Sequence, residues 1–129
     1  MKVYISGKMT GCPDLNRQAF DEAEKRPTAK GHFVINPVNI SVTFGTAEEL
    51  AKSFAIHYDL PGARVGLHFS DLIRGQDLAR AVMDADLAAV RSCDAIYLLR
   101  GWETSHGAKK ELAEAIEHGL KVMQEGAAQ

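Results

Sequence analysis

The stretch SCDAIYLLRGWETSHGAKKE, residues 92–111, decides the fold of this chain. Its apolar run at residues 95–99 predicts a buried strand, and the glycine-containing loop that follows leads into the first turn of a helix. A strand followed by a helix start aims backbone N–H groups and a helix dipole at one point, which favours an anion such as phosphate. Glu111 follows one turn further along. The stretch therefore predicts an anion cradle beside a carboxylate, which suits an enzyme acting on a nucleotide or a sugar phosphate.

On both sides of this stretch, strand-like runs alternate with segments of helical spacing. We expect further strands at residues 2–6, 32–36 and 120–123, helices at 14–26, 47–58, 77–91 and 105–118, and a tail at 124–129. The helix from residue 14 is expected to end or kink before Pro27. The alternation predicts a single-domain, three-layer α/β/α fold, Rossmann-like or flavodoxin-like, with a parallel sheet of four to five strands.

The segment from about residue 40 to 75 has the weakest pattern in the chain. Helical spacing is clear over residues 47–58, a turn is expected at 60–62, and the stretch to Phe69 is expected to be loop. A loop of this length in a compact domain is often a lid or a binding loop. A contact between subunits explains the segment equally well.

Composition narrows the class of protein and of partner. Of 129 residues, 46% are hydrophobic and 25% charged, and the formal net charge is -2, which argues against nucleic acid or an acidic membrane as a partner. No signal peptide or bilayer-spanning stretch is recognisable, so we expect a cytoplasmic protein. Cys12 and Cys93 suggest neither a disulfide framework nor a zinc site, and the histidines show no metal-ligand spacing. We expect no metal and no cofactor.

The loops at the carboxyl ends of the strands are the expected ligand site, because ligands of open parallel sheets bind there. This rule brings together the loops that follow Ser6, Asn36 and Leu99. The loop over residues 7–11, with Gly7, Met9 and Gly11, is either an ordinary turn or a second wall of the site.

The loop after the stretch's strand carries three candidate binding residues. Ser105 is a natural N-cap residue and, in addition, a candidate ligand for a phosphate or sugar hydroxyl. Gly107 would let that ligand approach the backbone. Trp102 is suited either to stacking on a base or to anchoring the loop by packing.

Two carboxylates are candidates for chemistry. On a helical wheel of residues 77–92, Asp86 falls in the middle of the apolar arc, where a carboxylate is costly unless it is paired, hydrogen-bonded or neutralised. Asp86 is therefore either a structural capping or pairing residue or an active-site group with a shifted pKa. Glu111 lies at the border of the buried face of its helix, which is expected to bury Ala108, Leu112, Ala115 and Ile116, and without further information it reads as a surface residue.

Two groups of residues resemble a known family. They are VYISGKMTG at 3–11, PDLN at 13–16 and the segment from Gly31 to Asn36 and Pro37, and then Asp86 with Leu87, CDAIYLL at 93–99, GWE at 101–103, Ser105, Gly107, Ala108 and Glu111. This pattern resembles a group of small bacterial and phage proteins of uncharacterised function that is similar to the nucleoside 2-deoxyribosyltransferase superfamily. That superfamily includes the deoxynucleoside 5′-monophosphate N-glycosidases. The resemblance implies one such domain over residues 1–129, with an insertion at about 40–75, and a homo-oligomer, a dimer or larger.

The resemblance also implies roles for individual residues. Glu111 occupies the position of the nucleophile, and Asp86 that of the carboxylate that handles protons at the base. Ser105 matches a phosphate-binding serine of the monophosphate-specific members, and Tyr4 and the loop 7–11 match the walls of the sugar and phosphate pocket. Two carboxylates of this kind suit cleavage of a glycosidic bond through an oxocarbenium-like state.

Three functions follow as expectations. The first is an N-glycosidase or 2-deoxyribosyltransferase that acts on a nucleotide, most simply a nucleoside 5′-monophosphate. The second is a protein that binds a nucleotide or a nucleotide-derived signal without cleaving it. The third is a structural or interaction protein with a vestigial site. This sequence departs from the family pattern at four residues, Lys109, Lys110, Trp102 and Glu103. The sequence does not determine the base, the sugar or the acceptor.

Overall fold

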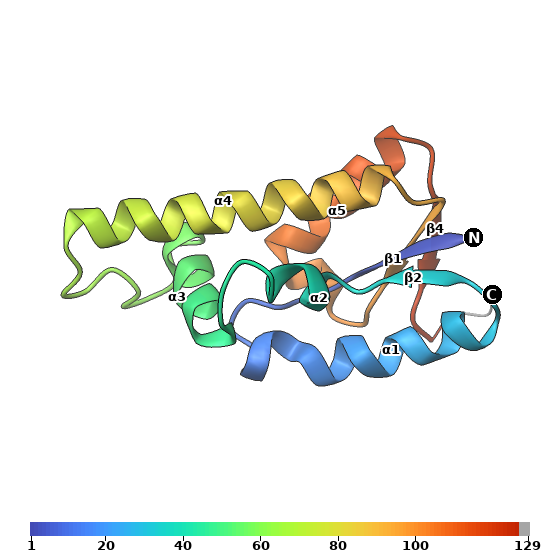
Figure 1. The fold of residues 1–129 in the computed structure, drawn as a ribbon, viewed down its shortest axis with the longest axis horizontal. Coiled ribbons are helices and arrows are strands. Elements are labelled where there is room, and N and C mark those ends of the chain that lie inside the picture. The colour runs from blue at the N-terminus through green and yellow to red at the C-terminus, as the bar shows by residue number, and fades with distance from the viewer. Residues whose placement is uncertain (127–129) are drawn as a thin grey trace.

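In a computed structural model, which describes residues 1–126, the chain is built around a parallel β-sheet (Figure 1). The described residues contribute four strands to it, β1 (Lys2–Ser6), β2 (Phe33–Ile35), β3 (Ala95–Leu98) and β4 (Lys121–Gln124). All neighbouring strands run parallel, in the order β2-β1-β3-β4. The α/β class with a parallel sheet is confirmed.

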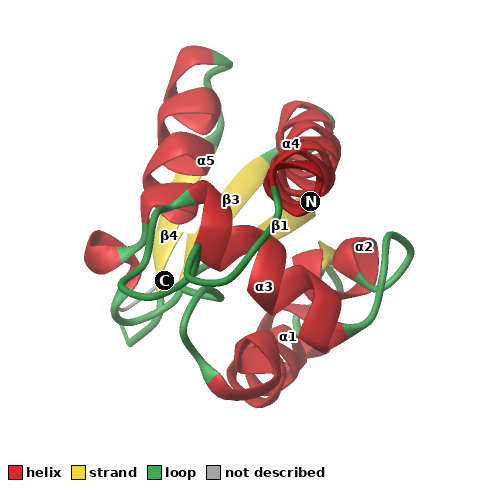
Figure 2. Ribbon diagram, turned by 90° about the vertical axis from the view of Figure 1, so that its left-hand side faces the viewer, coloured by secondary structure: helices red, strands yellow, loops and turns green. Residues whose placement is uncertain are grey.

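Helices cover both faces of the sheet (Figure 2). The α-helices are α1 (Arg17–Ala29), α2 (Pro37–Ser41), α3 (Ala47–His57), α4 (Phe69–Arg91) and α5 (His106–Glu117), with 3-10 turns η1 (Pro13–Asn16) and η2 (Trp102–Thr104). Helix α1 lies on one face, and α4 and α5 lie on the other, which gives the expected three layers. Among the described residues, no helix combines the length and the apolar character needed to cross a membrane.

The alternation of side chains along β1 separates the two halves of the core. Val3 and Ile5 pack with Phe20 of α1 on one face. Tyr4 packs with Val90 of α4 and Ala115 of α5 on the opposite face. Because successive strand residues point to opposite faces, Ser6 lies on the same side as Tyr4. Two polar, fully buried side chains of β1 are thereby directed toward α5.

The chain order creates a crevice between β1 and β3. From β1 the chain crosses to β2 on one side, and it later returns to β3 on the other side of β1. Neighbouring strands whose connections diverge in this way leave an opening at their carboxyl ends, where ligands of such sheets bind. Ser6 at the end of β1 is in register with Leu98 of β3, so both following loops begin at the same level.

The segment from 40 to 75 is mostly helical. Helix α3 begins with a capping box formed by Thr46 and Glu49 and buries Leu50 and Phe54 against Ala79 and Val82 of α4. Helix α4 begins at Phe69 rather than near residue 77, because the Asp71 carboxylate accepts a hydrogen bond from the His68 N–H at 3.1 Å and caps the helix there. The predicted loop is therefore confined to the residues between α3 and α4.

Helix α1 differs from its prediction at both ends. Its start is a 3-10 turn in which Asp14, Leu15 and Asn16 have positive φ angles, and regular helix begins only at Arg17. Its end lies beyond Pro27, which sits inside the helix. Pro27 has no N–H to donate to the carbonyl group four residues earlier, yet the helix continues to Ala29, so the expected end before Pro27 is not observed. Of the predicted tail at 124–129, Gln124 is the end of β4, and residues 127–129 lie outside the described part.

Gly7 permits the close approach of the loops that follow β1 and β3. A Cβ atom at residue 7 would lie 2.9 Å from Cβ and 2.9 Å from Cδ1 of Leu99, a buried residue. We predict that Gly7→Ala lowers the free energy of unfolding by about 1–3 kcal/mol through overpacking, as measured by urea denaturation. Gly45→Ala is the matched control, because a Cβ there meets its nearest atom at 3.7 Å. Equal stability of the two variants would contradict this account.

Candidate functional site

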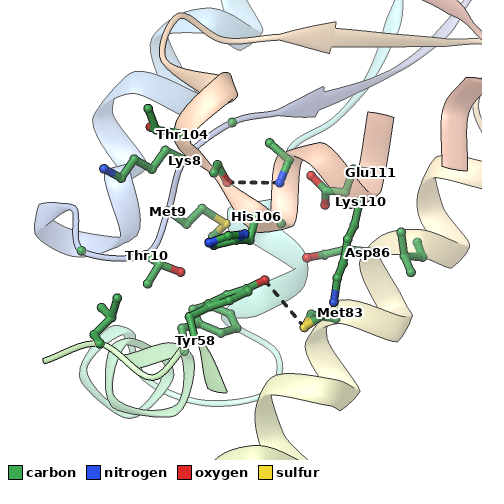
Figure 3. Close-up of a pocket in the computed structure, with 18 residues that line it drawn as sticks. Lys8, Met9, Thr10, Tyr58, Met83, Asp86, Thr104, His106, Lys110 and Glu111 are labelled. Atoms are coloured by element: carbon green, nitrogen blue, oxygen red, sulfur yellow. Dashed lines mark hydrogen bonds between the residues drawn. The ribbon is translucent and has the colours of Figure 1, made fainter. Parts of the chain in front are cut away.

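A cavity of about 310 Å³ opens at the carboxyl ends of β1 and β3 (Figure 3). Its walls come from the loop after β1, from α3 and the residues after it, from the middle of α4 and from the first turns of α5. The lining residues are Gly7, Lys8, Met9, Thr10, Gly11, Phe54, Tyr58, Leu60, Met83, Asp86, Leu87, Thr104, Ser105, His106, Gly107, Ala108, Lys110 and Glu111. The cavity therefore lies in the crevice between β1 and β3 that the strand order predicts.

Glu111 is held at the floor of the cavity by two hydroxyl groups. The Tyr4 hydroxyl donates to Oε2 of Glu111 at 2.5 Å, and the Ser6 hydroxyl donates to Oε1 at 2.7 Å. Tyr4 and Ser6 are fully buried, and Glu111 is 9% exposed. Two donors, one on each oxygen, fix the plane of the carboxylate. Tyr4 and Ser6 therefore orient Glu111 from beneath, rather than lining the cavity as the resemblance implies.

The buried stripe of α5 runs through Glu111 itself. Ala108, Glu111 and Ala115 are buried, whereas Ile116, which was expected in the core, is 63% exposed. The apolar residues of α5 predict a buried face that includes Ile116, whereas the observed buried face includes Glu111. Glu111 can be buried because the hydroxyls of β1 give it the hydrogen-bond partners that a buried carboxylate needs. The interpretation of Glu111 as a surface residue is wrong.

Asp86 faces the same cavity from α4. It belongs to the buried stripe of that helix, with Ala79, Val82 and Val90, and is 7% exposed. Among residues 1–126, its buried Oδ1 atom has no hydrogen-bond partner. Figure 3 shows the carboxyl group directed into the cavity, toward the side where Tyr58 and Met83 lie. The prediction that Asp86 faces inward is confirmed, and the unsatisfied oxygen favours a ligand-binding role over a capping or pairing one.

The pKa values of both carboxyl groups are raised, and the charge of Glu111 contributes to the shift of Asp86. Burial, and then the charge of Glu111, raise the pKa of Asp86 to about 9. Burial raises the pKa of Glu111 to about 7, although the hydrogen bonds from Tyr4 and Ser6 oppose that increase by favouring the ionised form. Because only Glu111 has donors that stabilise its anion, Glu111 loses its proton first and Asp86 keeps its proton longer. Two coupled acids with separated pKa values are typical of an acid and base pair.

The N-terminus of α5 forms the side of the cavity that suits an anion. The Ser105 side chain accepts a hydrogen bond from the Ala108 N–H at 3.1 Å, so Ser105 is the N-cap residue of α5 and also lines the cavity. A Cβ on Gly107 would lie 3.4 Å from the Tyr58 hydroxyl oxygen, so a glycine there leaves room beside the helix start. The helix dipole adds a favourable potential for an anion at this point.

The loop over residues 7–11 is the second wall that the sequence suggested. Gly7, Met9 and Gly11 all line the cavity. The Asn16 side-chain amide donates to the Lys8 carbonyl oxygen at 2.9 Å, and the Cys12 N–H donates to the Met9 carbonyl oxygen at 3.2 Å. These bonds attach the backbone of the loop to the left-handed turn that precedes α1.

Two predicted binding residues lie elsewhere. Asn36 follows the edge strand β2, accepts a hydrogen bond from the Val38 N–H at 3.1 Å and donates to Asp21 at 3.0 Å, so it caps α2. Trp102 is half-buried and packs against the core cluster that contains Tyr4 and Val90. Its role is that of a packing anchor for the loop after β3, which was the second interpretation given to it.

Sequence reasoning missed several lining residues, above all Tyr58 and His106. Their rings stack with centroids 5.5 Å apart and planes 18° apart, which joins the end of α3 to the start of α5. Lys8 and Lys110 also line the cavity, and Figure 3 shows the ammonium group of Lys110 beside Met83 and Asp86. The sequence places Tyr58 at the end of a helical segment. It does not indicate which face of the sheet that segment covers, so Tyr58 could not be assigned to the site from the sequence.

Metal-ligating side chains come together in one place outside the cavity. Within the described residues, Glu114, Glu117 and His118 offer ligand atoms that lie within 4.8 Å of one another at the surface end of α5. Glu114 already forms a 2.8 Å ion pair with Arg91. The cluster therefore has a structural explanation and stands apart from the two carboxylates of the cavity.

Comparison with known proteins identifies the family but not an activity. Residues 1–59 and 65–124 match the family described as "Domain of unknown function (DUF4406)", and the chain belongs to that family. Comparisons with curated proteins and with solved structures gave no significant match.

Stability should depend on pH through Asp86 and, over a narrower range, through Glu111, whose pKa is raised to about 7. The pKa of Asp86 is raised to about 9 in the folded chain, against about 3.9 when unfolded. As pH rises between these values, the unfolded chain releases a proton that the folded chain keeps, so stability falls by up to about 1.4 kcal/mol per pH unit. We predict that Asp86→Asn flattens this decline in urea unfolding measured from pH 5 to 8.

Asp84→Asn, an exposed change on the same helix, is the control and should leave the pH dependence as in the unmodified protein. An Asp86→Asn profile parallel to that of the unmodified protein would show that Asp86 is ionised in the folded state.

Proposed function

We propose that this member of the DUF4406 family cleaves the N-glycosidic bond of a nucleoside 5′-monophosphate, as an N-glycosidase or a 2-deoxyribosyltransferase. The observation that carries the proposal is the pair of buried carboxylates, Glu111 and Asp86, that faces one cavity with separated pKa values. Cleavage of a glycosidic bond needs one carboxylate at the anomeric carbon and one proton donor at the leaving group. The sequence resemblance to the nucleoside 2-deoxyribosyltransferase superfamily supports the same assignment.

Glu111 is the nucleophile in this proposal. The hydroxyls of Tyr4 and Ser6 hold its carboxylate and favour its ionised form. Each carboxylate oxygen has a second lone pair, so both hydrogen bonds leave Glu111 able to attack. One Glu111 oxygen forms a bond to C1′ of the sugar while the bond from C1′ to the base nitrogen breaks. The electron pair of the broken bond leaves with the base.

Asp86 is the acid that assists this departure. Its raised pKa keeps a proton on the carboxyl group near neutral pH, and its free Oδ1 faces the cavity. The proton passes from Asp86 to the departing base, and the resulting carboxylate then removes a proton from the second reactant. If that reactant is water, the products are free base and sugar phosphate. If it is another base, its nitrogen displaces Glu111 from C1′ and a new nucleotide forms.

The remaining polar groups of the cavity suit a phosphate. Ser105, Gly107 and the first turns of α5 line the cavity. Lys110 adds a positive charge near Asp86 (Figure 3). Binding energy from a phosphate that takes no part in the reaction would position C1′ against Glu111, which is how remote contacts accelerate a reaction.

A second function, nucleotide binding without cleavage, has one observation in its favour. Both oxygens of Glu111 already have hydroxyl partners, as a purely structural carboxylate would. In that case the cavity would retain a nucleotide intact. Binding to the folded state alone would raise the thermal unfolding temperature without forming a product.

Glu111→Gln separates these functions. We predict that the purified protein releases free base from at least one ribo- or deoxyribonucleoside 5′-monophosphate, followed by chromatography, and that Glu111→Gln reduces this release by about 10³-fold or more, since a nucleophile is lost. The variant should still bind the nucleotide, because the amide keeps the shape of the side chain.

Glu117→Gln, an exposed change on the same helix, is the matched control and should retain full activity. Undiminished base release by Glu111→Gln would refute the mechanism. Nucleotide-dependent thermal stabilisation without release, in the folded unmodified protein, would instead support the binding function.

A further inference from the structure

The Tyr58 hydroxyl is a polar group of the cavity that the proposed mechanism leaves unused. Tyr58 follows α3, is half-buried and lines the cavity. Among residues 1–126, the hydrogen bond recorded for this hydroxyl is a long one to the sulfur of Met83 at 3.9 Å. A thioether is a weak acceptor, so the hydroxyl is available to a stronger partner.

The ring that carries this hydroxyl is firmly placed. It stacks on His106 with centroids 5.5 Å apart and meets His57 edge-on at 4.8 Å. The hydroxyl oxygen lies close enough to Gly107 that a Cβ there would approach it to 3.4 Å. A hydroxyl with a fixed position and a weak partner has the properties of a group set aside for a ligand.

The hydroxyl shares its part of the cavity with Asp86. In Figure 3 the Tyr58 hydroxyl and the Asp86 carboxyl group point into the same region from α3 and α4, with Met83 beside them. Asp86 has an unpartnered Oδ1 there and is nine-tenths buried. Burial, and then the charges of Glu111 and Asp86, raise the pKa of Tyr58, so its hydroxyl keeps its proton at physiological pH. Two protonated groups from different helices thus meet at one end of the cavity.

We propose that Tyr58 is a base-recognition residue, whose hydroxyl forms a hydrogen bond with the edge of the nucleobase beside the atom that Asp86 protonates. This inference rests on the proposed function, because it places the leaving base at the Asp86 end and the phosphate at the Ser105 end. It gives the α3 segment a direct role in the site: Tyr58 supplies one contact to the base, and its stacking on His106 connects that contact to the start of α5.

The test compares ligands with and without a base in a protein that does not turn over. Glu111→Gln is titrated calorimetrically with the ribo- and deoxyribonucleoside 5′-monophosphates and, separately, with ribose 5-phosphate and 2-deoxyribose 5-phosphate. Adding Tyr58→Phe keeps the ring and removes the hydroxyl. We expect this change to weaken binding of the preferred nucleotide by about three- to tenfold, the effect of one hydrogen bond, and to alter binding of the corresponding sugar phosphate by less than about twofold.

Tyr97→Phe in the same background is the control, because Tyr97 lies in the core on the opposite face of the sheet. Unchanged nucleotide affinity in Tyr58→Phe, with binding intact in Glu111→Gln, overturns the role of Tyr58 and leaves the proposed function standing. An equal loss for both ligands also overturns it, since Tyr58 would then act on the whole cavity. Absence of binding by Glu111→Gln to nucleotides and sugar phosphate alike overturns the proposed function and this inference with it.

Discussion

The burial of two carboxylates within reach of one another is the constraint on which the rest of this structure depends. Neither Glu111 nor Asp86 is more than 9% exposed, and the charge of Glu111 raises the pKa of Asp86. A buried carboxylate is costly unless it is hydrogen-bonded or protonated. The fold meets this cost differently at the two positions. Glu111 receives two hydroxyl donors from β1, whereas Asp86 has an unpartnered oxygen and a strongly raised pKa.

The topology of the sheet explains why these groups meet. Parallel strands bring the ends of β1 and β3 to one level, and the crossovers leave a crevice there. The alternation along β1 directs Tyr4 and Ser6 toward α5, which starts after β3 and carries Glu111 two residues beyond its first full turn. Helix α4 then passes over the same face and contributes Asp86. Each side chain is positioned by a regular element, and such elements hold reacting groups more precisely than loops do.

Much of this arrangement was accessible from the sequence, because periodicity reports which residues face inward. The wheel of residues 77–92 placed Asp86 in an apolar arc, and the strand, loop and helix at 92–111 located the α5 end of the cavity. The burial of Glu111 was not accessible in the same way. It depends on Tyr4 and Ser6, more than a hundred residues away, and periodicity carries no information on partners so distant. Asn36 was placed near the site by a rule about strand ends, but β2 is an edge strand, and its end lies away from the crevice between β1 and β3.

The segment from 40 to 75 was likewise only partly predictable from the sequence. The helix over residues 47–58 was recognisable from its spacing, but the role of the segment depends on the packing of α3 against α4, which joins residues that are apart in the chain. That packing brings Phe54 and Tyr58 to the cavity. The end of α3 and the residues after it thus form a wall of the cavity, and a contact of this segment with another subunit stays a prediction.

The proposed chemistry requires Glu111 to ionise first and Asp86 to keep its proton near neutral pH. This order of ionisation can be measured by a carbon-13 NMR titration of the side-chain carboxyl groups, assigned with Asp86→Asn and Glu111→Gln. We expect two coupled titrations well above the ordinary carboxyl range, with the higher one lost in Asp86→Asn. Titration of both groups near pH 4, as for solvent-exposed carboxylates, would contradict it.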